Sequence, residues 1–135
     1  MRKILLSLLL FNLVLSQPIG YEFLDALKAF EDDKLSNDKQ ARENLVKLAS
    51  TDKNSAFLLG YYYKTPKYKN VNIKLSFSYY LQSAKLGEVD AMLITGWNYY
   101  KGKGVDYNMK QAKYWLEKAA IAGDKEAEAM LGFIF

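Results

Sequence analysis

The sequence predicts an all-α protein, a short α/α solenoid built from helix-turn-helix repeats. The first observation behind this prediction is a fixed period, since Gly60, Gly96 and Gly132 follow one another at intervals of 36 residues. The second is that each 36-residue unit holds two stretches with helical spacing of apolar residues, separated by a turn. A fixed period in the thirties is typical of stacked helical hairpins.

Residues 1–16 have the features of a secretory signal peptide, in the expected order. Arg2 and Lys3 precede an apolar run over residues 4–15, and Ser16 is small enough for a cleavage site. The apolar run is too short to span a bilayer, which takes about twenty residues. We expect cleavage after Ser16 and a periplasmic or secreted mature chain, with no membrane contact after cleavage. The alternative is an uncleaved anchor or a buried first helix.

Residues 17–54 are expected to form a diverged helical hairpin that caps the array. The stretches YEFLDALKAFEDD and DKQARENLVKLAS both show helical periodicity, and Asp38 is placed to cap the second helix. Terminal units of solenoids need a polar outer face, which this charged pair of helices can supply.

Two units follow, at residues 55–90 and 91–126, and they align without a gap. The second unit predicts a helix over residues 91–101, a glycine turn, and a helix over residues 108–122. A buried stripe is expected on the later helix, and Asp124 is placed to cap the helix that follows. The stripe comprises Ala112, Trp115 or Leu116, and Ala119. Gly123 suits the left-handed position just past a helix end.

These residues resemble the Sel-1-like repeats, a family related to the tetratricopeptide repeat. The resemblance is most specific in the second unit, where Thr95 replaces the usual leucine. The matching residues there are Ala91, Gly96, Tyr99, Gly102, Gly104, Val105, Ala112, Trp115, Lys118, Ala119, Ala120 and Gly123. The unit at 55–90 is degenerate, because Pro66 and Tyr68 stand where the turn glycines belong.

Residues 127–135 restart the pattern as the first helix of an incomplete repeat. We expect this helix to pack on the preceding hairpin. Its apolar end, Phe133 to Phe135, also suits contact with a partner or with a second copy in a homodimer. A truncated coding sequence is a further alternative.

The composition excludes several kinds of chemistry. The chain has no cysteine and no histidine, so it lacks the ligands of structural zinc sites and the nucleophiles and bases of cysteine or histidine catalysis. No paired carboxylate site or phosphate-binding loop is visible. The net charge of +4 is spread along the chain, which does not indicate nucleic-acid binding. We therefore predict a non-enzyme without cofactor or metal.

Aromatic residues are the unusual feature of this sequence, with eleven tyrosines and two tryptophans. Tyr63, Tyr79, Tyr99 and Trp115 occupy structural positions of the repeat that the chain resembles. Other aromatic and lysine positions in the first helix of each unit suit a protein interface, where tyrosine and tryptophan often dominate binding. The residues predicted to contact a partner on the concave face are Tyr61, Tyr62, Lys64, Trp97, Asn98, Tyr100 and Lys101.

The resemblance and the signal peptide together predict an exported protein–protein interaction module. A more specific expectation, carried by the resemblance, is a periplasmic immunity protein that neutralises a secreted antibacterial effector. One alternative is a β-lactam-binding or β-lactam-hydrolysing protein, as described for cysteine-rich relatives, although the cysteines are missing here. Another is a fragment of a longer repeat scaffold.

Overall fold

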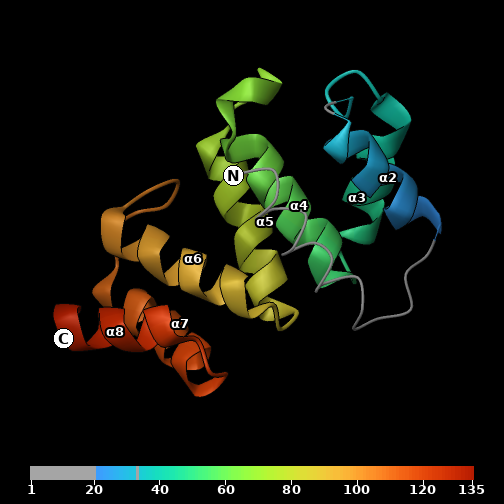
Figure 1. The fold of residues 1–135 in the computed structure, drawn as a ribbon. Helices are drawn as coiled ribbons and strands as arrows, with labels where there is room; N and C mark the ends of the chain where they lie inside the picture. Colours follow the sequence, from blue (N-terminus) through green and yellow to red (C-terminus); the bar gives the residue numbers. More distant parts are fainter. Residues whose placement is uncertain (1–20, 33) are drawn as a thin grey trace.

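All regular structure in the described residues is helical (Figure 1). The computed structural model describes residues 21–32 and 34–135, so the signal peptide predicted for residues 1–16 lies outside the described residues. The elements are α2 (Tyr21–Glu31), α3 (Lys39–Leu48), α4 (Lys53–Lys64), the 3-10 turn η1 (Pro66–Tyr68), α5 (Ile73–Lys85), α6 (Val89–Lys101), α7 (Met109–Ile121) and α8 (Lys125–Ile134). The predicted fold class is confirmed.

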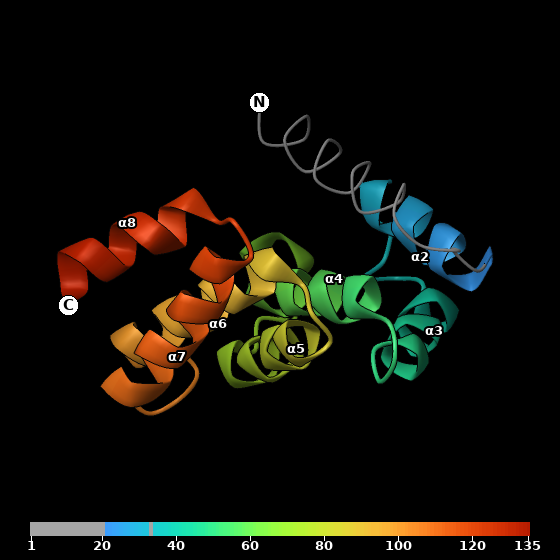
Figure 2. The ribbon, with the colours of Figure 1, turned by 90° about the horizontal axis from the view of Figure 1, so that it is seen from below.

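Each helix packs chiefly against the next one along the chain, as in a solenoid. The pair α2 and α3 lies at one end of the array and α8 lies at the other (Figure 2). The helices α4 and α5 form one hairpin and α6 and α7 the next. The first helices of successive hairpins are therefore α4, α6 and α8.

Short polar side chains fix where most of these helices begin. Asp38 accepts a hydrogen bond from the backbone N–H of Ala41, and Asp124 accepts one from that of Ala127, so both predicted caps are confirmed. Asn72 and Asn108 cap α5 and α7 in the same way, 36 residues apart. Such caps satisfy a backbone donor that the helix itself leaves unpaired.

The turns of the two hairpins both reverse the direction of the chain, but they use different residues. The turn after α6 uses Gly102 and Gly104, both with positive φ, as expected for glycine. The turn after α4 instead contains η1, which starts at Pro66 and ends with Lys69 in the left-handed region at φ 59°. The first turn therefore differs in shape from the glycine turn, yet α4 and α5 still pack together as a hairpin.

The repeat register is visible in the burial pattern. Ser55, Ala91 and Ala127 occupy equivalent positions near the start of α4, α6 and α8, and all three are fully buried. The stripe predicted on α7 is also confirmed, because Ala112, Trp115, Leu116 and Ala119 are all buried.

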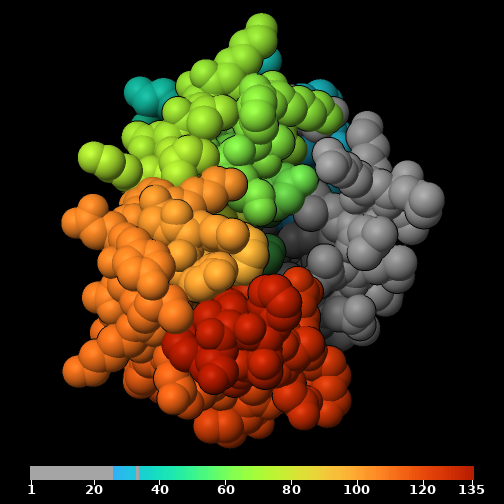
Figure 3. Space-filling view, turned by 90° about the vertical axis from the view of Figure 1, so that its left-hand side faces the viewer, coloured from blue at the N-terminus to red at the C-terminus, as the bar shows by residue number. Residues whose placement is uncertain are grey.

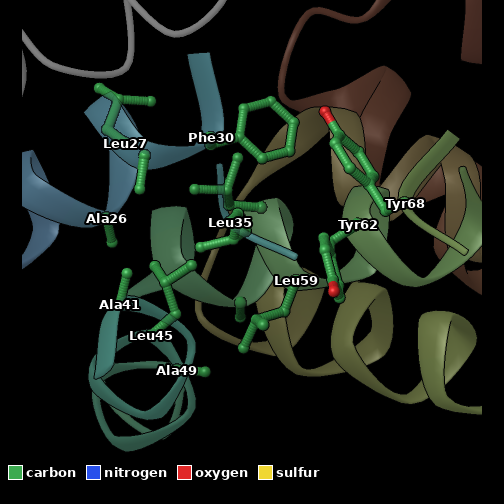
Figure 4. Close-up of a cluster of buried hydrophobic side chains, with 13 residues drawn as sticks. Ala26, Leu27, Phe30, Leu35, Ala41, Leu45, Ala49, Leu59, Tyr62 and Tyr68 are labelled. Carbon is green, nitrogen blue, oxygen red and sulfur yellow. The ribbon is translucent and has the colours of Figure 1, made fainter. Parts of the chain in front are cut away.

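The leading hairpin covers one side of α4. Side chains from α2, α3 and α4 gather around Leu35, which lies in the loop between α2 and α3 (Figure 4). Phe30 and Leu45 come from the leading hairpin, whereas Leu59 and Tyr62 come from α4. This contact makes residues 26–49 part of the same hydrophobic core as the first repeat.

The last helix packs on α7 as expected, through Ala127, Leu131 and Ile134. Its other side is open, and Phe133 is 90 % exposed. Within the described residues, no helix is long and apolar enough to cross a membrane.

Candidate functional site

A groove lies between α6 and α8, the first helices of successive repeats. Figure 3 shows the face on which α6, in light orange, lies beside α8, in red. The groove has a volume of about 510 Å³, and we call it the α6–α8 groove. Its walls are Leu93, Ile94, Trp97, Tyr100 and Lys101 from α6, and Glu126, Ala129, Met130, Phe133 and Ile134 from α8. Ten residues, of which eight are apolar or aromatic, make this a surface for apolar side chains.

One end of the α6–α8 groove carries a cation held on aromatic rings. The ammonium of Lys101 lies 4.7 Å from the ring centroid of Trp97 and 5.1 Å from that of Tyr100. Lys101 forms no ion pair with any residue of the described ranges. The side chain of Trp97 is 39 % exposed, so part of its indole ring is available for contact with another molecule. This end of the groove is therefore both apolar and positively charged.

The other end of the groove is negatively charged. Burial raises the pKa of Asp90, at the start of α6, and the nearby carboxylates of Asp124 and Glu126 raise it further. Val89 at the start of α6 packs in one cluster with Ala127 near the start of α8, so the two helices start close together and Lys101 lies at the opposite end. A ligand that follows the groove would meet Glu126 first and Lys101 last.

A smaller cavity of about 150 Å³ adjoins the groove along α6. It is bounded by the end of α4, the first half of α5, the middle of α6 and the α6–α7 turn. Its lining residues are Lys64, Ile73, Ser76, Tyr80, Ile94, Trp97, Asn98 and Lys103. Ile94 and Trp97 also line the α6–α8 groove, so the two hollows share a wall. We call this second hollow the Lys64–Lys103 cavity.

The two hairpins match a family profile over more than half of the chain. The profile of the Sel1 repeat aligns with residues 53–88 and again with residues 89–124. The chain belongs to the Sel1 repeat family. The profile units start two residues before those delimited above from the sequence, at the first residues of α4 and α6.

Solved structures of Sel1 repeat proteins have the same fold. A Sel1 repeat protein from Oxalobacter formigenes matches with a TM-score of 0.73 and 27% identity, covering 84% of this chain and 34% of that protein. The cysteine-rich protein B of Helicobacter pylori matches with a TM-score of 0.66 and 28% identity, covering 78% of this chain and 79% of that protein.

A third structure, a protective antigen of uropathogenic Escherichia coli with an SLR fold, matches with a TM-score of 0.72. Its identity is 23%, and the match covers 84% of this chain and 25% of the antigen, so it speaks for the fold alone. The chain thus spans about a third of the length of the Oxalobacter protein and a quarter of that of the antigen. Comparison with curated protein sequences gave no significant match.

The structure divides the predicted contact residues of these Sel1 repeats into three groups. Trp97, Tyr100 and Lys101 line the α6–α8 groove. Lys64 and Asn98, together with Trp97, line the Lys64–Lys103 cavity. The remaining two, Tyr61 and Tyr62, belong to the core beside the leading hairpin.

The expectation that Tyr62 lies on an open concave face is wrong, and the leading hairpin partly covers Tyr61. Tyr62 is fully buried, and its hydroxyl accepts a hydrogen bond of 2.6 Å from the amide of Asn70. Tyr61 is half-buried and packs edge-on against Phe30 of α2, with ring centroids 5.6 Å apart. The leading hairpin covers this part of α4, which periodicity within one repeat does not reveal. Asn98 is also mostly enclosed, at 9 % exposed.

Sequence reasoning missed the apolar walls of the groove. Leu93 and Ile94 read as ordinary helix positions, and Met130 comes from a different repeat. The exposed Phe133 was the available signal, since an apolar residue at the end of an incomplete repeat was already unusual. Lys103 lies between the two glycines of the predicted turn, and its side chain lines the second cavity.

The described residues contain no group of three or more histidine, cysteine, aspartate or glutamate side chains arranged to hold a metal ion. Among the same residues, the acidic side chains near the groove lie at helix starts, where Asp124 already caps α8. The arrangement of the groove and the cavity is that of a binding surface. Sel1 repeats typically form scaffolds for protein–protein interaction.

Proposed function

We propose that this chain is an exported interaction module that holds a segment of a partner protein in the α6–α8 groove. The observation that carries the proposal is the groove itself, an apolar trough in which Trp97 and Phe133 stay exposed within the described part of the chain. Large exposed apolar side chains that gather on one surface mark interaction sites. The export part of the proposal is supported by the signal-peptide pattern of residues 1–16.

The groove favours a segment with a particular order of side chains. Lys101, which has no acidic partner in the described ranges, attracts a negative group at one end. Glu126, close to Asp90 and Asp124, attracts a positive group at the other end. Between them the walls accept apolar side chains. The charges set the direction of the segment, while the buried apolar area supplies most of the affinity.

The test is a capture experiment with the chain from Gln17 onward and three baits. The parent is compared with Trp97→Ala and with Tyr114→Ala as the matched control. Tyr114 is a 45 % exposed aromatic on α7, and Lys118 lies over its ring at 5.1 Å, much as Lys101 lies over Trp97. Only the pair on α6 lines the groove.

We expect one envelope protein to bind the parent and the Tyr114→Ala variant and to be lost with Trp97→Ala. The interaction is then measured with the purified protein, where a hot-spot tryptophan typically contributes 2 kcal/mol or more, roughly a thirtyfold change in affinity. Equal capture by all three baits would place the interface elsewhere. Failure of the parent to capture any envelope protein would contradict the proposal.

A narrower proposal is that the partner is a secreted antibacterial effector, which the chain neutralises as a periplasmic immunity protein. It is supported by the Sel1 family membership and by the predicted export. The captured protein should then arrest growth when directed to the periplasm alone. Co-expression of the parent chain should restore growth, and co-expression of Trp97→Ala should not. A partner without toxicity would rule out the immunity role and leave the interaction role intact.

Self-association is a second candidate use of the same end of the molecule. It is favoured by Phe133, which is 90 % exposed, and by the exposed Phe135 directly after the same helix. Sedimentation velocity of the parent and of Phe133→Ser tests it directly. A concentration-dependent dimer that disappears with the substitution would support pairing through α8. A monomer throughout the accessible concentration range would exclude it.

A further inference from the structure

One side of α8 is open where the corresponding sides of α4 and α6 are covered by a second helix. Gly132 corresponds to Gly60 and Gly96 in the 36-residue period. The two earlier glycines are buried, and a β-carbon added to either would collide with the second helix of its hairpin, α5 or α7. Gly132 is exposed, and a β-carbon there would meet nothing within 4 Å in the described part of the chain.

The aromatic position three residues further on shows the same difference. Phe135 corresponds to Tyr63 and Tyr99, which are partly buried. Tyr63 stacks on Tyr79 of α5 with ring centroids 5.8 Å apart, and Tyr99 packs in one cluster with Trp115 of α7. Phe135 is 51 % exposed. Its counterparts are thus covered by an aromatic residue of the second helix, whereas Phe135 stays open in the described residues.

This side of α8 is distinct from the α6–α8 groove. Residues three and four positions apart lie together on one side of a helix, and we call the open set around Gly132 the Gly132 face. It comprises Lys125, Glu128, Gly132 and Phe135. All four are exposed, and none of them lines the groove.

The helices that cover the two earlier glycines have side chains of the same order of size. Each has a small residue, a large one four positions later, and another small one three positions after that. The residues are Ser76, Tyr80 and Ser83 in α5, and Ala112, Leu116 and Ala119 in α7, and all six are buried. The large residue lies against the glycine of the first helix. The hydroxyl of Ser76 also donates a hydrogen bond of 2.6 Å to the carbonyl of Gly60.

The charge at the start of α8 adds a requirement that the earlier repeats do not have. Glu128 stands where α6 has Met92, and it forms an ion pair of 3.0 Å with Lys125. Asp124 and Glu126 leave this turn with an excess of negative charge. The helices of a hairpin run in opposite directions, so the start of α8 would face the C-terminal half of an added helix. A basic residue is favourable there, both opposite Glu128 and near a helix C-terminus.

We propose that the Gly132 face binds an amphipathic helix of a partner protein, which completes a third hairpin in trans. Its large residue packs on Gly132 between two small ones, and a basic residue one turn later pairs with Glu128. A second folded copy does not supply this helix, because α5 and α7 already cover α4 and α6 in their own hairpins. The proposal does not rest on the α6–α8 groove, so the two can fail separately.

The probe is a peptide with the sequence of residues 108–123, the α7 helix with its cap. A helix of this length is marginal alone in water. Lys113 and Glu117 are exposed and already form an i,i+4 ion pair at 3.9 Å, so a lactam between their side chains can hold the peptide helical without changing the buried side. The other peptides carry the same lactam with Ala120→Lys, which adds the basic residue, or with Leu116→Ala, which removes the large one.

Each peptide is titrated into the folded chain from Gln17 onward, and the backbone amides of residues 131–135 are followed by two-dimensional NMR. Gly132→Gln blocks the contact, and the open surroundings of Gly132 allow this substitution without a clash. Glu128→Gln removes the charge. Trp97→Ala is the control, because it alters the α6–α8 groove and leaves the Gly132 face intact.

We expect the Ala120→Lys peptide to shift these amides and to bind roughly threefold more tightly than the unchanged peptide, the effect of one exposed ion pair. The Leu116→Ala peptide should bind at least about tenfold more weakly, because it buries less apolar surface. Gly132→Gln should abolish binding, and Glu128→Gln should remove the threefold preference. Trp97→Ala should change nothing.

Four results would overturn the proposal. They are no binding of the Ala120→Lys peptide, equal binding of the Leu116→Ala peptide, undiminished binding to Gly132→Gln, and loss of binding with Trp97→Ala. Sedimentation velocity of the chain alone adds a fifth, since a dimer that Gly132→Gln dissociates would make a second copy the occupant. Capture of a partner that Trp97→Ala abolishes would still support the interaction role if the Gly132 face binds no helix.

Discussion

Gly96 of α6 packs directly against Leu116 of α7, so closely that a β-carbon at position 96 would lie 2.8 Å from Cγ of Leu116. The preceding repeat has the same relationship, where a β-carbon at Gly60 would lie 2.9 Å from the ring of Tyr80. The third member of the series differs, because a β-carbon at Gly132 would meet nothing within 4 Å. The repeated glycine therefore marks where the two helices of a hairpin make contact.

This difference gives opposite predictions for the same substitution. Gly96→Ala should lower the free energy of unfolding by about 1–3 kcal/mol, because Leu116 and the nearby carbonyl of Ala112 must move. Gly132→Ala should raise it by up to about 1 kcal/mol, since alanine restricts the unfolded chain and meets no obstacle in α8. Urea unfolding followed by circular dichroism measures both. Equal changes in the two variants would show that the close contact is absent.

Two buried tyrosines of the first repeat, Tyr62 and Tyr80, predict a second contrast. Tyr62→Phe should destabilise the protein by about 0.5–1.5 kcal/mol, because the hydroxyl loses its hydrogen bond from Asn70. Tyr80→Phe should be neutral or stabilising, because the Tyr80 hydroxyl is buried without a hydrogen-bond partner in the described part of the chain. Thermal unfolding of the two variants checks the order. A larger loss for Tyr80→Phe would reveal a hydrogen bond to a bound water molecule.

Asp90 predicts a dependence of stability on pH. Its position in the first turn of α6 favours the charged form, but burial and the carboxylates of Asp124 and Glu126 outweigh this and raise its pKa. Between the ordinary and the raised pKa the folded state binds more protons than the unfolded state. The free energy of unfolding therefore falls as pH rises through this interval.

Asp90→Asn removes this unfavourable charge. The variant should be more stable than the parent at about pH 7, well above the ordinary pKa of aspartate, where the unfavourable environment of the folded carboxylate lowers the stability of the parent. The advantage should vanish at about pH 3, below the ordinary pKa of aspartate, where the parent carboxyl is neutral. Urea unfolding at both pH values measures the difference. A stability gain that persists at the lower pH would assign the effect to something other than charge.

Most of the fold could be predicted from the repeat period. Gly60, Gly96 and Gly132 established the 36-residue unit, and Asp38 and Asp124 marked helix starts that the structure confirms. These signals are local in the sequence, so they can be recognised without knowing how the helices pack. The shape of the turn after α4 was harder to predict. It is a 3-10 turn that starts at Pro66 and is followed by Lys69 in the left-handed region, and the glycine pattern does not predict such a turn.

The candidate site was harder to predict, because it depends on contacts between repeats. Trp97, Tyr100 and Lys101 were found from their aromatic and basic character on one helix. Tyr62 has the same character, yet the leading hairpin buries it. Met130, on the opposite wall of the groove, comes from the next repeat. Which first-helix side chains are covered is decided by the neighbouring hairpin, and periodicity within one repeat contains no information about that neighbour.

The two lysines of the Lys64–Lys103 cavity allow a prediction about the pKa of Lys64. Burial lowers the pKa of Lys64 most, and the charge of Lys103 lowers it further. Lys103→Gln should therefore raise the pKa of Lys64 towards the ordinary lysine value, whereas Lys85→Gln should leave it unchanged. Carbon-13 NMR of the Lys64 side chain against pH measures it. An unchanged pKa in Lys103→Gln would show that the two ammonium groups do not share the cavity.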